Sequence, residues 1–154
     1  MAKTRAIALL ESKNIPHRVE SFDAAEFSAE EVAHKLNLPL PIVFKTLVAR
    51  AGEKEIVMAV IPGDKNLNVN LLAKALQVKR AQLVDLKELE PLTGYKKGGC
   101  SPIVAKRQFP VLIDEGVLTH REVAVSAGLR GVQVLIAPSH LIEVCNAKVV
   151  SIAT

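Results

Sequence analysis

The chain has 154 residues, 49% of them hydrophobic, which is enough to bury the core of one domain and leaves little room for two. The apolar runs are short and broken by polar residues, which excludes a membrane-spanning helix, and the two cysteines, Cys100 and Cys145, suggest no disulfide framework. A formal charge of +4 favours polyanionic partners, whereas an aromatic content of 3% argues against a surface that stacks successive bases. These features predict a reduced, cytoplasmic protein.

Hydrophobic periodicity and turn residues predict helices and strands in a mixed order. In chain order they are a helix over 4–13, a strand over 17–22, a loop over 23–27, a helix over 28–36, strands over 42–50 and 56–61, a helix beginning at Asn68 or Asn70, an apolar step over 82–84, a helix from Asp85, strands over 111–114, 122–126 and 132–136 with a turn over 127–131, a helix capped by Ser139 through Cys145, and a strand over 149–152.

The strands over 42–50 and 56–61 are joined by a short polar turn, so they predict a hairpin, and the wholly apolar second strand is expected at the centre of a sheet. Ser28 and Glu31 have the spacing of a capping box at a helix start. Few regular βαβ units occur, so the chain predicts an α+β fold: one domain, residues 1–154, with a mixed, curled sheet surrounded by helices.

Lys45 stands out because it lies inside a segment otherwise suited to burial. In a strand it shares a face with Leu47, while Phe44 and Thr46 point the other way. Desolvating an ammonium is costly unless an anion meets it, so Lys45 either pairs with a carboxylate or receives an anionic ligand. A lysine whose amine simply reaches water is the alternative interpretation.

Residues 93–102 form the densest irregular stretch of the chain. Cys100 follows two glycines and lies near Lys97, an environment that can lower the pKa of a thiol and make it a nucleophile. No histidine lies nearby in the sequence, so a small buried hydrophobe is the favoured interpretation. Gly98 and Gly99 offer backbone N–H groups to an oxyanion or a phosphate, or form only a turn. Further charges bracket this loop and predict either a basic rim or a solvated edge: Lys96, Lys97, Lys106 and Arg107.

The four histidines have no metal-ligand spacing to one another or to the cysteines, so no metal is expected. Gly98 and Gly99 lack the glycine spacing of a Walker or dinucleotide-binding motif, and no other cofactor is expected. No catalytic dyad or triad is evident either.

Four blocks of sequence together resemble one known family. They are 44–47, 93–95 followed by 98–102, 125–131 and 136–138, and they recur in the order found in the YbaK/ProX family of aminoacyl-tRNA deacylases. This family is related to the editing domain of some prolyl-tRNA synthetases. The resemblance covers nearly the whole chain and implies a compact domain with a mixed sheet curled around a pocket.

The resemblance also implies an activity, partners and a site. The expected reaction is hydrolysis of the ester in mischarged tRNA(Pro), carrying cysteine or a related small amino acid, by water or by the substrate's own thiol. Aminoacyl-tRNA is the expected partner, with prolyl-tRNA synthetase as a second one. Lys45 and Gly99 are the expected catalytic residues. The expected substrate-binding residues are Phe22, Phe27, Phe44, Thr46, Gly98, Cys100, Ser101, Pro102, Ser126 and Gly128.

Two positions depart from the family pattern. Phe22 replaces a tyrosine of some members, and Cys100 replaces an aliphatic residue, so the amino acid removed is left open. Two other functions also remain open: a non-catalytic module that binds tRNA or the synthetase, and a hydrolase of another small ester or amide.

Overall fold

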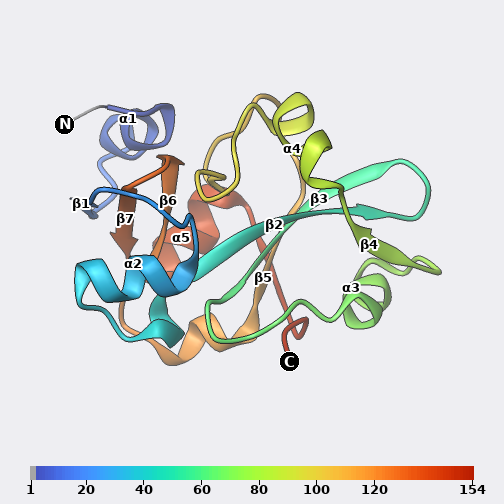
Figure 1. Ribbon diagram of the computed structural model, residues 1–154. Coiled ribbons are helices and arrows are strands. Elements are labelled where there is room, and N and C mark those ends of the chain that lie inside the picture. The colour runs from blue at the N-terminus through green and yellow to red at the C-terminus, as the bar shows by residue number, and fades with distance from the viewer. Residues whose placement is uncertain (1–2) are drawn as a thin grey trace.

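A computed structural model describes residues 3–154 of the chain, and its strands fall into two hydrogen-bonded sheets (Figure 1). The antiparallel three-stranded sheet has the order β1 (Arg18–Ser21), β7 (Val132–Ile136), β6 (Val123–Leu129). The mixed five-stranded sheet has the order β4 (Ala81–Leu83), β2 (Phe44–Ala51), β3 (Glu55–Pro62), β5 (Val111–Asp114), β8 (Lys148–Val150). A parallel bridge between Val43 and Ala124 connects the two sheets. The predicted α+β fold with a mixed sheet is therefore confirmed.

The long β2–β3 hairpin crosses the middle of the molecule in Figure 1, and β3 is the central strand of its sheet, as predicted. Alternate residues of β3 enter two different cores, because side chains along a strand point to opposite faces. Met58 and Val60 join the larger core, which includes β6 and β7, whereas Val57 and Ala59 join a smaller core that includes α3. Burial on both faces explains why this strand is apolar throughout.

Five α-helices and two 3-10 helices connect the strands within residues 3–154. They are α1 (Arg5–Ser12), α2 (Ala29–Leu36), η1 (Leu40–Ile42), α3 (Val69–Leu76), α4 (Leu86–Thr93), η2 (Glu115–Thr119) and α5 (Pro138–Cys145). The two 3-10 helices were not expected from the sequence. None of the helices in this part of the chain is long and apolar enough to cross a membrane.

The start of α2 follows the predicted capping pattern only in part. Ser28 is the N-cap, and its hydroxyl accepts the N–H of Glu31 at 3.1 Å. Asn37 closes the helix in the left-handed conformation, as expected. The Glu31 carboxylate, however, accepts N–H groups of the loop that precedes Ser28, as described below. At α3 the N-cap is Asn68 rather than Asn70.

Several predicted boundaries were wrong. Helix α5 has Ala137 as its N-cap and Pro138 in its first turn, because proline supplies helical φ without needing an N–H partner, so Ser139 is not the cap. Strand β6 continues past a bulge to Leu129, which leaves a much shorter turn than 127–131. The last strand, β8, ends at Val150 rather than at 152. Helix α4 begins beside the predicted Asp85, which is its N-cap residue, although the Asp85 side chain makes no capping bond.

Candidate functional site

A cavity of about 360 Å³ lies beside the outer edge of β2. Its walls come from the loop before α2, from α2 itself, from the residue after β4, from α4 and from β6 and β7. A further part comes from residues 94–102, which contain Gly98 and Gly99 and are called the glycine loop below. Strand β4 pairs with β2 only at Ala49–Ala51. The preceding residues of β2 therefore have no strand beside them on this edge within residues 3–154, and Phe44 to Val48 line the cavity instead.

Lys45 lies in this cavity wall and is half-buried. Its Nζ atom lies 3.5 Å from the carbonyl oxygen of Gly63, and no carboxylate of residues 3–154 forms an ion pair with it. Gly63 itself packs against the residue that precedes β2, because a Cβ there would lie 2.7 Å from the carbonyl oxygen of Val43. Of the interpretations open from the sequence, pairing with a carboxylate is thus wrong, whereas an amine that reaches water and an amine that receives an anion both fit this position in the cavity wall.

The glycine loop contributes Gly98 to the cavity wall. Gly98 has a φ of +82°, a conformation that side chains other than glycine rarely adopt. A Cβ at this position would lie 2.6 Å from the Cβ of Phe27, so the absence of a side chain allows the two loops to touch. Gly99 does not line the cavity, and its N–H donates to the carbonyl of Lys96 at 2.9 Å.

Phe27 and Arg130 join three separate segments at the cavity. Phe27 lines the wall and has a φ of +61°, which is unusual for a bulky residue. The Arg130 guanidinium carbon lies 3.7 Å from the centre of the Phe27 ring, which places the cation over the aromatic face. Arg130 Nε also donates to the carbonyl of Lys97 at 2.8 Å. The loop before α2, the glycine loop and the β6–β7 turn are held together by these contacts.

Cys100 lines the cavity but is not a reactive thiol. The residue is buried, and this burial raises the pKa of its thiol to about 12. The thiolate is the nucleophilic form of cysteine, so this burial agrees with the interpretation favoured from the sequence, a small buried hydrophobe.

The other predicted substrate-binding residues divide into two sets. Phe22, Phe44, Thr46 and Ser126 line the cavity together with those already described. The remaining three do not line this cavity: Ser101, Pro102 and Gly128. The Ser101 hydroxyl accepts the N–H of Ile103, and Pro102 lines a second cavity. Gly128 packs against the ring of Tyr95.

Gln133 and Glu31 are among the polar wall residues that were missed from the sequence. Gln133 lies between two valines in β7 and is 4% exposed; a polar residue inside an apolar strand was the signal that could have identified it. Glu31 was noticed only as part of a capping box. Both belong to elements whose packing against the cavity depends on long-range contacts.

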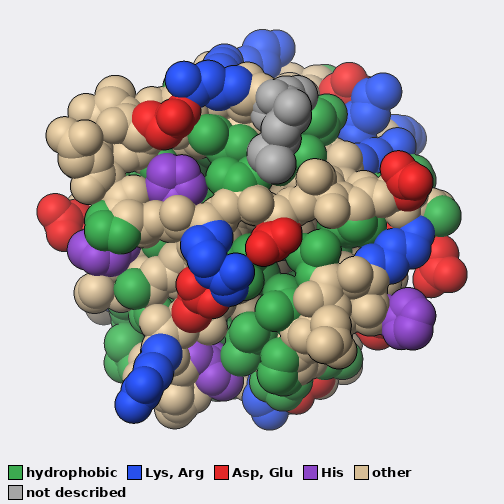
Figure 2. Space-filling model, turned by 90° about the vertical axis from the view of Figure 1, so that its left-hand side faces the viewer, with side chains coloured by type: hydrophobic (Ala, Val, Ile, Leu, Met, Phe, Trp, Pro, Cys, Tyr) green, Lys and Arg blue, Asp and Glu red, His purple; other side chains and the backbone are tan. Residues whose placement is uncertain are grey.

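The basic residues near the glycine loop reach the surface of the molecule. The residues that bracket the glycine loop, Lys96, Lys97, Lys106 and Arg107, are exposed, and Lys97 reaches the cavity wall. On the face that carries α1, β1 and α2, positive and negative side chains are interspersed instead (Figure 2). No group of three or more metal-ligating side chains is present within residues 3–154.

Comparison with known proteins identifies the family. Residues 23–144 match the family profile described as an aminoacyl-tRNA editing domain, and this span includes every residue that lines the cavity except Phe22. The chain belongs to the aminoacyl-tRNA editing domain family. Members of this family act on aminoacyl-tRNA, so the relationship to aminoacyl-tRNA deacylases predicted from the four blocks is confirmed.

Relatives of this editing-domain protein include both free-standing proteins and parts of larger enzymes. A protein of Enterococcus faecalis, named provisionally as a Cys-tRNA(Pro)/Cys-tRNA(Cys) deacylase, is 39% identical, and the match covers 99% of this chain and 94% of the relative. A proline–tRNA ligase of Lactobacillus helveticus is 31% identical over 64% of this chain, but the match spans only 17% of the ligase.

Solved structures show the same fold. A crystal structure described as a candidate trans-editing enzyme for prolyl-tRNA synthetase superimposes with a TM-score of 0.87, covering 100% of this chain and 98% of the other, at 22% identity. A structure of a hypothetical protein gives a TM-score of 0.88 at 23% identity, covering 96% of this chain and 97% of the other.

Proposed function

We propose that this protein hydrolyses the ester bond of mischarged aminoacyl-tRNA, and that turnover depends on Lys45. The observation that carries the proposal is the Lys45 side chain, which lines a largely apolar cavity and has no carboxylate partner within residues 3–154. An ammonium in such a place binds an anion or stabilises developing negative charge strongly, because few waters compete with it. The terminal phosphate of tRNA and the carbonyl oxygen of the ester are the two groups it would meet.

The glycine loop would supply the remaining electrostatic stabilisation. The Gly99 N–H is occupied by Lys96, whereas the N–H groups of Gly98 and Cys100 have no acceptor within the described part of the chain. We assign the oxyanion contact to these two groups rather than to Gly99, since backbone N–H groups aimed at developing charge accelerate acyl transfer. This revises the role expected for Gly99 from the sequence.

The nucleophile would be water or the substrate's own thiol. The cavity wall contains no histidine, and the Cys100 thiol has a pKa of about 12, so neither supplies a general base or an enzymic nucleophile. With a cysteinyl ester, the substrate sulfur would bond to the carbonyl carbon, the bond to the ribose oxygen would break, and the tRNA hydroxyl would leave with the thiol proton. Water would then open the resulting cyclic thioester to give free cysteine. Holding the two groups together would make this step efficient.

The proposed substrate is tRNA(Pro) carrying cysteine, or a related small amino acid such as alanine or serine. The name of the Enterococcus faecalis relative and the aligned part of the proline–tRNA ligases support this choice. A cavity walled by Phe22, Phe27 and Phe44 separates such small side chains only weakly by size, because one methylene changes binding by about 1–3 kcal/mol. Chemistry at the thiol, or prolyl-tRNA synthetase as a partner, would add the remaining selectivity.

The test is deacylation of tRNA(Pro) charged in parallel with cysteine, alanine, serine and proline, with and without prolyl-tRNA synthetase. Selective loss of one non-cognate ester supports the proposal and names the substrate. Binding of tRNA without loss of any ester would favour a non-catalytic module. Equal hydrolysis of a small aminoacyl ester that lacks the tRNA body would favour a general esterase.

A further inference from the structure

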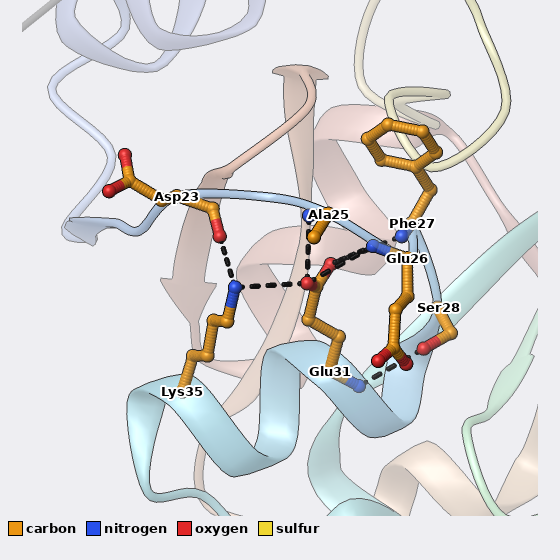
Figure 3. A network of polar contacts seen from close by, with 7 residues as sticks. All are labelled: Asp23, Ala25, Glu26, Phe27, Ser28, Glu31 and Lys35. Carbon is orange, nitrogen blue, oxygen red and sulfur yellow. Dashed lines mark hydrogen bonds and ion pairs between the residues drawn. The ribbon is translucent and has the colours of Figure 1, made fainter.

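The loop before α2 is organised by one buried carboxylate, Glu31 (Figure 3). Glu31 is 6% exposed, and its oxygens accept three consecutive backbone N–H groups. The N–H of Ala25 lies 2.8 Å away, that of Glu26 lies 3.1 Å from both oxygens, and that of Phe27 lies 3.1 Å away. A capping box would direct this side chain to the N–H of Ser28, so these bonds serve a different purpose from capping.

Lys35 completes the arrangement one helical turn later. Its Nζ lies 3.0 Å from Glu31 Oε2 and also donates to the carbonyl oxygen of Asp23, as Figure 3 shows. Burial raises the pKa of Glu31, but the bonds from Ala25, Lys35, Phe27 and Glu26 together lower it to about 2. The carboxylate is therefore ionised at neutral pH, and the loop is tied to α2 at both of its ends.

These hydrogen bonds hold Phe27 in an unfavourable backbone conformation. A left-handed φ in a residue with a bulky side chain costs of order 1 kcal/mol or more, and it persists only where surrounding contacts hold it. The Phe27 N–H bond to Glu31 is such a contact. On its other side Phe27 carries the Arg130 guanidinium, and its Cβ occupies the space left by the missing side chain of Gly98. Displacement of Phe27 therefore displaces the glycine loop.

We propose that Glu31 is a positioning residue of the deacylation site: by holding residues 25–27, it fixes Phe27 and, through Phe27, the position of Gly98 beside the substrate. This inference rests on the proposed function. It assigns to Glu31 no contact with reacting atoms. Its effect on catalysis is geometric, since a displacement of about 1 Å in a site can reduce the rate about a hundredfold.

The test compares Glu31→Gln with Asp114→Asn. Glutamine keeps the size of Glu31 but places an NH2 donor against N–H groups that need an acceptor. Asp114 is the matched control, because it is 5% exposed, also accepts three backbone N–H groups, from Gly116, Ile152 and Ala153, and lines neither cavity. Both variants disturb the bonds from three backbone N–H groups, and Glu31→Gln also removes the charge that pairs with Lys35, so its stability should fall somewhat more.

At a temperature where both variants are folded, Glu31→Gln should lower kcat/KM by about tenfold or more, mainly through kcat, while Asp114→Asn should stay within about threefold of wild type. Equal losses in the two variants, or full activity of Glu31→Gln, would overturn the proposal.

A second readout does not depend on activity. Fluorophenylalanine would label the four phenylalanines, and Phe27→Leu would assign one of the four fluorine resonances. The Phe27 resonance should shift or broaden in Glu31→Gln and stay unchanged in Asp114→Asn. An unchanged Phe27 resonance in Glu31→Gln would refute the positioning role. If wild type hydrolysed no ester, the proposed function would fail, and these spectra would still decide whether Glu31 holds Phe27.

Discussion

Replacement of Gly98 by alanine tests how closely the glycine loop packs against Phe27. The new Cβ would lie 2.6 Å from Phe27 Cβ and 3.1 Å from both the Cα and the carbonyl oxygen of Phe27, none of which can rotate away. The left-handed φ of Gly98 adds about 1–2 kcal/mol of strain for a residue with a Cβ, and overpacking of this kind adds about 1–3 kcal/mol. The expected loss in the free energy of unfolding is therefore about 2–5 kcal/mol.

Gly94→Ala is the matched control for this experiment. Gly94 has nearly the same φ, +81°, but its nearest neighbour would be the Cβ of Lys106 at 3.5 Å, an ordinary contact. The strain should be shared by both variants, and only Gly98→Ala should carry the steric term. Urea unfolding monitored by circular dichroism gives the two free energies, and deacylation of Cys-tRNA(Pro) gives the activities.

The structure predicts that Gly98→Ala is the less stable variant by about 1–3 kcal/mol, unless the loop moves outward, in which case deacylation falls instead. Combining Gly98→Ala with Phe27→Gly removes the closest contact and should recover about 1 kcal/mol beyond additivity. Equal stability and equal activity of Gly98→Ala and Gly94→Ala would refute the reasoning that Phe27 requires a glycine opposite it.

Two further predictions follow from shifted pKa values. The folded-state pKa of Glu31 is about 2 against an ordinary value of 4.5, so its stabilising contribution is fully present above pH 4.5 and is lost as the pH falls towards 2. The free energies of unfolding of wild type and Glu31→Gln should therefore converge between pH 4.5 and pH 2. A constant difference between the two free energies over this range would contradict the prediction. Burial raises the pKa of Cys100 and of Cys145 to about 12, so both thiols should react with a disulfide reagent at pH 8 far more slowly in the native protein than in urea; rapid native reaction would contradict their burial.

The local signals in the sequence identified the elements well where short-range chemistry decides them. Ser28 capped the expected helix, and the apolar run of β3 lay at the sheet centre, because capping geometry and two-sided burial leave direct marks on neighbouring residues. Lys45 was found by the same reasoning, since an amine among apolar neighbours is conspicuous in a strand of period two.

The parts of the site that were missed depend on contacts between distant segments. Gly99 was predicted to present its N–H to the substrate, but the direction of a loop N–H is set by backbone conformation, which composition does not specify. The role of Glu31 depends on the path of the loop that precedes α2. The contact between Gly98 and Phe27 joins residues that only the folded chain brings together.

The most direct test of the central claim is the rate of Cys-tRNA(Pro) deacylation by wild type, Lys45→Ala and Lys54→Ala. Lys54 lies in the exposed turn of the same β2–β3 hairpin and lines neither cavity, so it controls for loss of a positive charge. The account predicts a fall of about a hundredfold or more for Lys45→Ala, because one electrostatic contact in such a site contributes about that much, and little change for Lys54→Ala. Turnover that survives in folded Lys45→Ala would contradict the account.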